Sequence, residues 1–292
     1  MKRFTMFLSA VIFFTCTALV IEAKKKKSSE VNSSAQNFRV NYRFWDRQVK
    51  CLRSMKGYPE NTYEGIQEAI LKGYNIIRCE VAFSKDNVPF LCRGGKVPGI
   101  NGMETTRNYH SSTLSEHEVG LRYGEQFKGI PMASVSEILA LCHRTNAILE
   151  LDCTNKESCP NENYILLYNM VKKHNMLGSV IFYDEAKNLE SLLEIDRNVI
   201  IDISHSVLTD SLDYELSVAA KAAVAEFSIR ANMYTPETGK RIHQAGYMIT
   251  LWPTESNLEM RKFTKEGIDR LASKTLGPTF HFRLERMAPP EQ

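Results

Sequence analysis

The sequence predicts an α/β fold, a closed TIM-type (β/α)8 barrel. From residue 48 onward, short apolar stretches typical of strands alternate with amphipathic stretches typical of helices, about eight of each. Runs such as Val199-Ile200-Ile201 are apolar throughout, which indicates parallel strands covered on both faces. We find no internal repeat and no second domain boundary, so the chain of 292 residues is interpreted as one barrel with terminal extensions.

Each expected strand is followed by an expected helix, with one interruption. After the second strand an irregular excursion runs from residue 94 to about 130, with a short helix around 115–123. The strands are expected at residues 48–52, 75–83, 147–153, 179–183, 199–204, 224–229, 247–252 and 268–273, with an adjoining β segment at 88–92. The helices are expected at residues 62–72, 134–144, 164–173, 186–195, 212–223, 236–245 and 258–266.

Residues 51–62 join the first strand to the first helix. Asn61 and Glu64 have the spacing of a capping box, and Gly73 is the expected C-cap of that helix. In an α/β barrel the active site lies at the carboxyl ends of the strands. This loop is therefore expected at the functional end of the barrel.

The N-terminal residues have the pattern of an export signal. A charged start precedes an apolar stretch from about residue 7 to 21, which ends in a small residue. We predict a signal peptide at 1–23, a polar, Lys-rich leader at 24–45, the barrel at 46–280 and a tail at 281–292. The chain is then exported, to the periplasm, the exterior or the cell surface, without a membrane span after cleavage; an uncleaved anchor is the alternative.

Charge and cysteine content narrow the function classes. The net charge of +3 and the absence of a basic stripe with interleaved aromatic residues argue against nucleic-acid binding. No C-x-x-C spacing indicates zinc. Export permits disulfides, and Cys153 with Cys159 is the expected pair. The oligomeric state is left open.

Ionisable residues gather where the second and third main strands end. Alternation places Arg78 and Glu80 on one face of the second strand, and Glu150 with Asp152 on one face of the third. Arg53 and Arg93 end neighbouring β segments. Buried charges are costly unless paired, so we expect three arginines to face three carboxylates at one mouth.

Several short motifs occur in a fixed order along the chain. They are Pro59-Glu60-Asn61-Thr62, Val81-Ala82-Phe83-Ser84-Lys85-Asp86-Asn87-Val88-Pro89, Thr113-Leu114-Ser115-Glu116, Phe127-Lys128-Gly129-Ile130-Pro131, Leu149-Glu150-Leu151, Tyr234-Thr235-Pro236-Glu237, residues 246–252 and Gly267-Ile268-Asp269. From Val49 to Pro278 the chain thereby resembles the glycerophosphodiester phosphodiesterase family, barrels of the phospholipase C-like type. The resemblance implies hydrolysis of glycerophosphodiesters with a divalent metal.

The positions of the family's two histidines differ here. The His-Arg-Gly after the first strand is matched by Leu52-Arg53-Ser54, and the His-Asp after the hairpin by Arg93-Gly94. The resemblance implies that those histidines transfer protons. Leucine cannot do so, and arginine stays protonated at any working pH. The residues that would carry catalysis are therefore unknown.

The metal-ligand positions differ as well. The family's Glu-x-Asp is matched by Arg78 and Glu80, and its Glu-x-Lys by Glu150 and Asp152. Both sets carry the same total charge, which favours an internal ion-pair cluster in place of a metal. The alternative is a displaced calcium or magnesium site on Glu80, Glu150 and Asp152; otherwise no cofactor is expected.

Three histidines and one tryptophan are further candidates for the site. His110 and His117 in the excursion and His205 after the fifth main strand are interpreted as surface or capping residues. Trp252 matches a family aromatic residue on the substrate side, and a barrel plug is its alternative role.

Three hypotheses follow. The leading one is an exported barrel of this family that has lost the usual mechanism and binds a small phosphodiester or other anion through Arg53, Arg78, Arg93, Glu60 and Trp252. The second is an active hydrolase with a rearranged metal site. The third is a non-catalytic structural or interaction barrel whose mouth is closed by ion pairs.

Overall fold

The computed structural model describes residues 39–46, 48–99, 102–206 and 212–278. The chain divides into two compact units, residues 1–39 and 40–292, and the second contains the barrel. The predicted signal peptide at 1–23, most of the predicted leader and the predicted tail at 281–292 lie outside the described residues.

Eight parallel strands close into a barrel, which confirms the predicted fold. Around the barrel the order is β1, β11, β10, β9, β8, β7, β6, β2, and pairing of β1 with β2 closes the ring. Their bounds are β1 (Gln48–Leu52), β2 (Ile76–Phe83), β6 (Ile148–Asp152), β7 (Val180–Asp184), β8 (Ile200–His205), β9 (Val224–Arg230), β10 (Met248–Trp252) and β11 (Arg270–Ser273).

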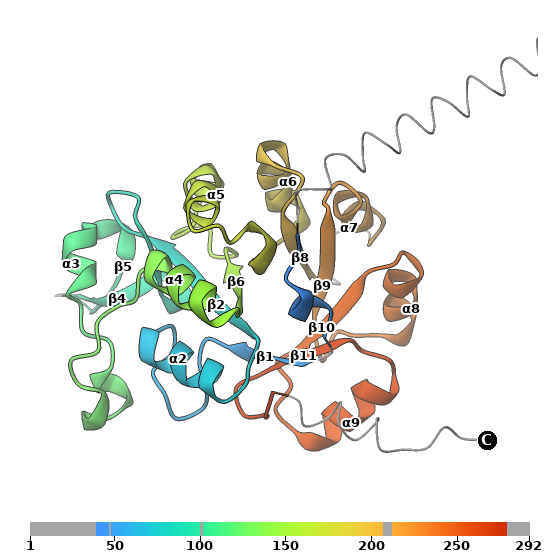
Figure 1. Ribbon diagram of the computed structural model, residues 1–292, viewed down its shortest axis with the longest axis horizontal. Coiled ribbons are helices and arrows are strands. Elements are labelled where there is room, and N and C mark those ends of the chain that lie inside the picture. Colours follow the sequence, from blue (N-terminus) through green and yellow to red (C-terminus); the bar gives the residue numbers. More distant parts are fainter. Residues whose placement is uncertain (1–38, 47, 100–101, 207–211, 279–292) are drawn as a thin grey trace, which may run out of the picture. The chain divides into compact units, whose positions relative to one another are not determined.

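Helices surround these strands (Figure 1). Those that connect successive strands are α2 (Tyr63–Leu71), α4 (Val135–Thr145), α5 (Tyr164–Lys173), α6 (Ala186–Ile195), α7 (Leu212–Ala219), α8 (Pro236–Gln244) and α9 (Asn257–Lys265). They match the expected helices to within a few residues, apart from α7, which ends before residue 223. In the described part of the chain, no helix is long and apolar enough to cross a bilayer.

The two faces of each strand have opposite character. On β1, Val49 and Cys51 point outward and join the apolar core beneath the helices, whereas Lys50 lies between them and is fully buried. The same alternation holds on β8 and β9, where Asp202 and Glu226 are buried outside that core. The helices thus pack against the apolar outer face of the barrel, whereas the barrel interior contains buried charged side chains.

The start of α2 corrects one sequence prediction. Thr62, not Asn61, is the N-cap, and its side chain accepts a hydrogen bond from the Gly65 amide. Asn61 has a left-handed backbone (φ 56°), and its Oδ1 accepts a bond from the Glu80 amide at 3.2 Å. The motif therefore ties this loop to β2. Gly73 follows the helix end with φ 95°, as expected for a C-cap glycine.

The β segment expected at 88–92 is present as β3 (Pro89–Leu91), antiparallel to β2. The excursion that follows holds more structure than predicted, namely the hairpin of β4 (Lys96–Gly99) and β5 (Gly102–Thr105) and the short helix α3 (Ser111–Ser115). The helix expected around 115–123 is wrong. Gly120 packs so closely that a Cβ would lie 1.9 Å from the Phe127 carbonyl oxygen, and Gly124 has φ 134°, so the chain forms separate 3-10 turns there.

A 3-10 turn, η1 (Tyr42–Trp45), closes the amino-terminal end of the barrel. Phe44 is fully buried, with the Arg270 guanidinium 4.5 Å from its ring centre. The Asn41 amide donates to the Gly178 carbonyl at 2.7 Å, directly before β7. Residues 42–45, predicted as the end of the leader, thus belong to the barrel, because an aromatic plug covers an otherwise open charged interior.

Phe44→Ala should lower the free energy of unfolding by about 3–5 kcal/mol, because it removes a fully buried ring. Trp45→Ala is the matched control, since Trp45 is 58 % exposed, and should cost well under half as much. Chemical denaturation of both variants measures the difference. Equal losses would show that η1 does not plug the barrel.

Candidate functional site

The barrel interior is organised around the Lys50 ammonium. Its Nζ donates to Asp202 Oδ2 at 2.8 Å and to the carboxylates of Glu150 and Glu226. All four side chains are fully buried. Arg270 bonds the other oxygen of Glu226, which extends the network toward the amino-terminal end. Of the residues expected in an ion-pair cluster, this network contains only Glu150; its central lysine was not predicted.

Burial and mutual interaction set the protonation of this cluster. Burial disfavours the Lys50 ammonium, but Asp202, Glu150 and Glu226 outweigh it and raise the pKa of Lys50. Burial raises the pKa of Asp202 to about 8, against the opposing effect of Lys50. For Glu226, the charges of Arg270 and Lys50 outweigh burial and lower its pKa. At neutral pH the extra proton of the cluster therefore sits on Asp202.

That proton balances the charge of the interior. Lys50 and Arg270, with Arg78 above them, supply three fixed cations. They face four carboxylates, those of Glu150, Asp152, Asp202 and Glu226. With Asp202 neutral, the cations and the remaining carboxylates are equal in number. The buried charges of the barrel interior then sum to zero.

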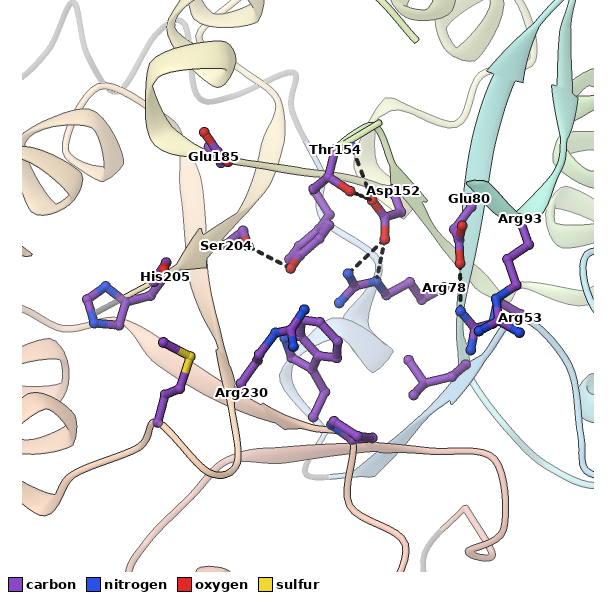
Figure 2. A pocket seen from close by; sticks show the side chains of 16 residues that line it. Arg53, Arg78, Glu80, Arg93, Asp152, Thr154, Glu185, Ser204, His205 and Arg230 are labelled. Atoms are coloured by element: carbon purple, nitrogen blue, oxygen red, sulfur yellow. Dashed lines mark hydrogen bonds and ion pairs between the residues drawn. The ribbon is translucent and has the colours of Figure 1, made fainter. Parts of the chain in front are cut away.

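Arg78 connects this unit to the mouth. Its Nη2 donates to Asp152 Oδ2 at 2.8 Å, and its Nε lies 3.6 Å from Glu150 Oε1. The guanidinium stacks 3.4 Å from the ring centre of Tyr183 and 5.0 Å from that of Trp252. Figure 2 shows Arg78 among the side chains that line the pocket, hydrogen-bonded to Asp152. This geometry fixes a permanent cation at the floor of the pocket.

A second set of ion pairs joins the turns after β1 and β3. Arg53 Nη1 donates to Glu80 Oε1 at 2.6 Å, and Glu80 Oε2 accepts from the Gly94 amide at 2.7 Å. Glu60 pairs with Arg53 at 3.2 Å, with Arg93 at 3.6 Å and with Lys274. Glu60, predicted to bind ligand, thus holds the arginines of the rim in place.

The loop after β6 supports the turn η2 (Arg93–Gly95). Asn155 Nδ2 donates to the Gly94 carbonyl at 2.8 Å. Gly95 has φ 64°, and a Cβ there would lie 2.2 Å from the Ser158 side chain. Only glycine fits both the backbone and the contact. These contacts with the loop after β6 therefore fix the turn that carries Arg93.

These groups surround a pocket of about 530 Å³ at the carboxyl ends of the strands. It is lined by Leu52, Arg53, Arg78, Glu80, Arg93, Asp152, Thr154, Tyr183, Glu185, Ser204, His205, Ser206, Arg230, Met233, Trp252 and Pro253. Four of these residues are arginines. Arg230 is exposed, its guanidinium lies 4.9 Å from the Trp252 ring centre, and it makes no ion pair with any described residue.

The carboxylates expected to bind a divalent metal do not converge on a shared vacant position. Glu80 is bonded by Arg53, Asp152 by Arg78, and Glu150 by the Lys50 ammonium. Among the described residues, the acidic group whose oxygens lie within 4.8 Å of one another is Glu150, Asp202 and Glu226, and Lys50 bonds to all three. These residues therefore do not fit a calcium or magnesium ion.

Proton-transfer groups are displaced from the pocket centre. Leu52 and Arg93, which the resemblance matches to the family histidines, line the pocket. His205 lies at its edge, where Nδ1 is 2.5 Å from Glu215 Oε2, and its imidazole points away from Arg78 and Asp152 in Figure 2. His205 thus fastens β8 to α7. His117 Nε2 is buried without a hydrogen-bond partner in the described residues.

The predicted disulfide is wrong: Cys153 and Cys159 are both free and buried. The adjacent Cys159 thiol, followed by burial, raises the pKa of Cys153 well above its ordinary value. A protonated thiol is a poor nucleophile, so this environment makes Cys153 unreactive.

Sequence reasoning missed Lys50, Asp202, Glu226, Arg230 and Arg270. The first three were detectable, because a charged residue inside a strand buried on both faces must point into the barrel. Arg230 directly follows the expected strand 224–229, which is a position that faces the mouth.

Several solved structures share this fold, although no family model and no curated protein match the sequence. The phosphodiesterase of Oleispira antarctica, in complex with the product sn-glycerol-3-phosphate, has a TM-score of 0.72 and 17% identity over 85% of this chain and 100% of that chain. The glycerophosphodiester phosphodiesterase of Thermotoga maritima has a TM-score of 0.62 and 18% identity, over 82% and 97%. That of Agrobacterium tumefaciens has 0.65 and 16%, over 78% and 96%. The resemblance is confirmed as a shared fold.

Asp202 generates a pH-dependence of stability. Its folded-state pKa of about 8 exceeds the ordinary 3.8, so the folded chain binds the extra proton between these values. Stability should therefore fall as pH rises from 5 to 8, by up to about 1.4 kcal/mol per pH unit from this residue.

Asp202→Asn should remove this contribution, because the amide is neutral throughout. The measurement is the free energy of unfolding of both proteins at several pH values, and their difference isolates Asp202 from the histidines. Parallel pH profiles would contradict the assignment of the proton to Asp202.

Proposed function

We propose that the chain is a diverged, exported member of the glycerophosphodiester phosphodiesterase family. It binds a small phosphate-containing or other anionic ligand at the barrel mouth and has lost the family's metal-dependent hydrolysis. The shared fold supports the scaffold, and the residues of the pocket support the ligand class.

The observation that carries the proposal is the stack of Arg78, Trp252 and Arg230. The indole has one guanidinium 5.0 Å and another 4.9 Å from its ring centre. Arg78 is already neutralised by Asp152, but Arg230 has no acidic partner among the described residues. An exposed guanidinium fixed by stacking at a pocket rim is suited to a phosphate, which it can bind through two parallel hydrogen bonds.

Three features argue against hydrolysis by the family mechanism. Leu52 cannot transfer a proton, and the Arg93 guanidinium keeps its proton. Each carboxylate at a family metal position is held by a lysine or arginine. Loss of even one positioned acid or base removes roughly 10²–10⁴ in rate.

Ligand binding should raise the melting temperature in a concentration-dependent way. With sn-glycerol-3-phosphate or inorganic phosphate at about 100 times the Kd, the free energy of unfolding rises by about 2.7 kcal/mol. Glycerol at the same concentration, with matched ionic strength, is the control. Identical melting curves in phosphate and in the control solution would favour the hypothesis of a mouth closed by ion pairs.

Arg230→Gln should weaken that binding by roughly 10- to 100-fold, the value of a charge-assisted hydrogen bond, without changing the stability of the unliganded protein. Arg261→Gln, an exposed arginine on α9, is the matched control and should bind as the parent does. Calorimetric titration measures both. Equal affinities of the two variants would remove Arg230 from the site.

The hypothesis of a rearranged metal enzyme makes a separate prediction. Glycerophosphocholine would be hydrolysed in calcium or magnesium, and both a chelator and Glu150→Ala would abolish the activity. We expect no turnover at ordinary enzyme rates, about 1–10³ per second, in either metal. Turnover at such rates would overturn the proposed loss of hydrolysis. Failure of anion binding alone would contradict the proposed ligand class but would not show that the protein hydrolyses diesters.

A further inference from the structure

The amino-terminal end of the barrel, opposite the pocket, carries exposed apolar side chains that the fold does not use. Tyr42 and Trp45 on η1 are 67 % and 58 % exposed, and Leu71 at the end of α2 is 74 % exposed. Arg43, between the two aromatic residues, donates to Asn75 Oδ1 at 2.7 Å. Asn75 directly precedes β2, so η1 and the end of α2 lie at the same end of the barrel.

The same end is rich in positive charge. Every connecting helix of the barrel ends there, because each is followed by the amino-terminal end of the next strand. Exposed cations at the last residues of these helices or in the connections are Lys72, Lys172, Lys173, Arg197, Lys221 and Lys265. The exposed acidic residues at corresponding positions are Asp46, Glu194 and Glu266. Lys72 and Lys221 are paired with Glu68 and Glu190, and Glu266 is paired with Lys262. Of the residues named here, Lys172, Lys173, Arg197 and Lys265 make no ion pair with any described residue, nor do the acids Asp46 and Glu194.

We propose that this basal surface, defined by Tyr42, Trp45, Leu71 and the six cations, docks on an anionic lipid bilayer. Tyrosine and tryptophan suit the headgroup region, where an apolar ring can be buried while its polar atom stays hydrated. The surrounding lysines and arginines complement anionic headgroups. The pocket then faces away from the bilayer, toward soluble ligands.

The sequence before η1 also favours a lipid over a protein partner. Lys24–Lys27 precede Tyr42 by about 15 residues, a length that can span roughly 50 Å at most. A polybasic run so near to η1 in the sequence adds attraction to anionic headgroups.

The two tryptophans report the orientation directly, because Trp45 lies at the basal surface and Trp252 at the mouth. In the full chain, Trp252→Phe leaves only Trp45, and Trp45→Phe leaves only Trp252. Each variant is mixed with vesicles of phosphatidylcholine containing phosphatidylglycerol, with and without brominated acyl chains. We expect Trp45 emission to shift to shorter wavelength and to be quenched by bromine, and Trp252 emission to be unchanged.

This readout separates docking of the barrel from attachment through the N-terminal segment alone. Chain that sediments with vesicles while Trp45 emission stays that of a hydrated indole would overturn the proposal. Quenching of Trp252 in place of Trp45 would also overturn it. So would a dimer in solution, or a complex with nucleic acid, that shields Trp45 while vesicles do not.

Charge variants provide the second test. Lys173→Gln with Lys265→Gln should weaken Trp45 insertion into anionic vesicles by about 30-fold, the value of two surface lysines. Lys85→Gln with Lys128→Gln, exposed lysines of the excursion after β2, is the matched control and should leave it unchanged. Equal effects of the two pairs would contradict docking by the basal surface.

Discussion

The Lys50 ammonium is the interaction on which the rest of the barrel depends. The Lys50 side chain extends from β1 and contacts carboxylates on β6, β8 and β9, so one ammonium group links four strands across the barrel interior. Removing either of the charged partners, Glu150 or Glu226, would leave an uncompensated buried charge, which is far more costly than losing a surface ion pair. Arg78 and Arg270 extend the same network to the mouth and to the Phe44 plug.

This network also explains the chemical character of the mouth. In a metal enzyme, carboxylates at the ends of neighbouring strands must stay free for an ion. Here the protein supplies its own cations, and the carboxylates serve to orient guanidinium groups. What remains available to a ligand is therefore positive charge on aromatic surfaces, with Arg230 as its most exposed part. A site of this kind suits recognition of an anion, in agreement with the proposed function.

Much of the fold could be predicted because alternation of apolar and amphipathic stretches is a strong signal. The eight strands and the charged ends of β2 and β6 follow from it. The interior partners of Lys50 were less visible, because they lie far apart in the sequence and meet only when the barrel closes. The N-cap at Thr62 and the broken helix near Gly120 depended on backbone conformations that no residue pattern specified. Likewise, the plug at Phe44 was hidden in a polar segment.

The contact between Gly95 and Ser158 has a consequence for how such a sequence can change over generations. Three strands and two α-helices separate these positions along the chain, yet a Cβ at residue 95 would collide with the Ser158 side chain. Replacing Gly95 by a residue with a side chain would first require glycine in place of Ser158. The left-handed backbone at position 95 would then also have to change. Drift at the two sites is therefore coupled, and a return to an ancestral arrangement of this turn would require several simultaneous substitutions.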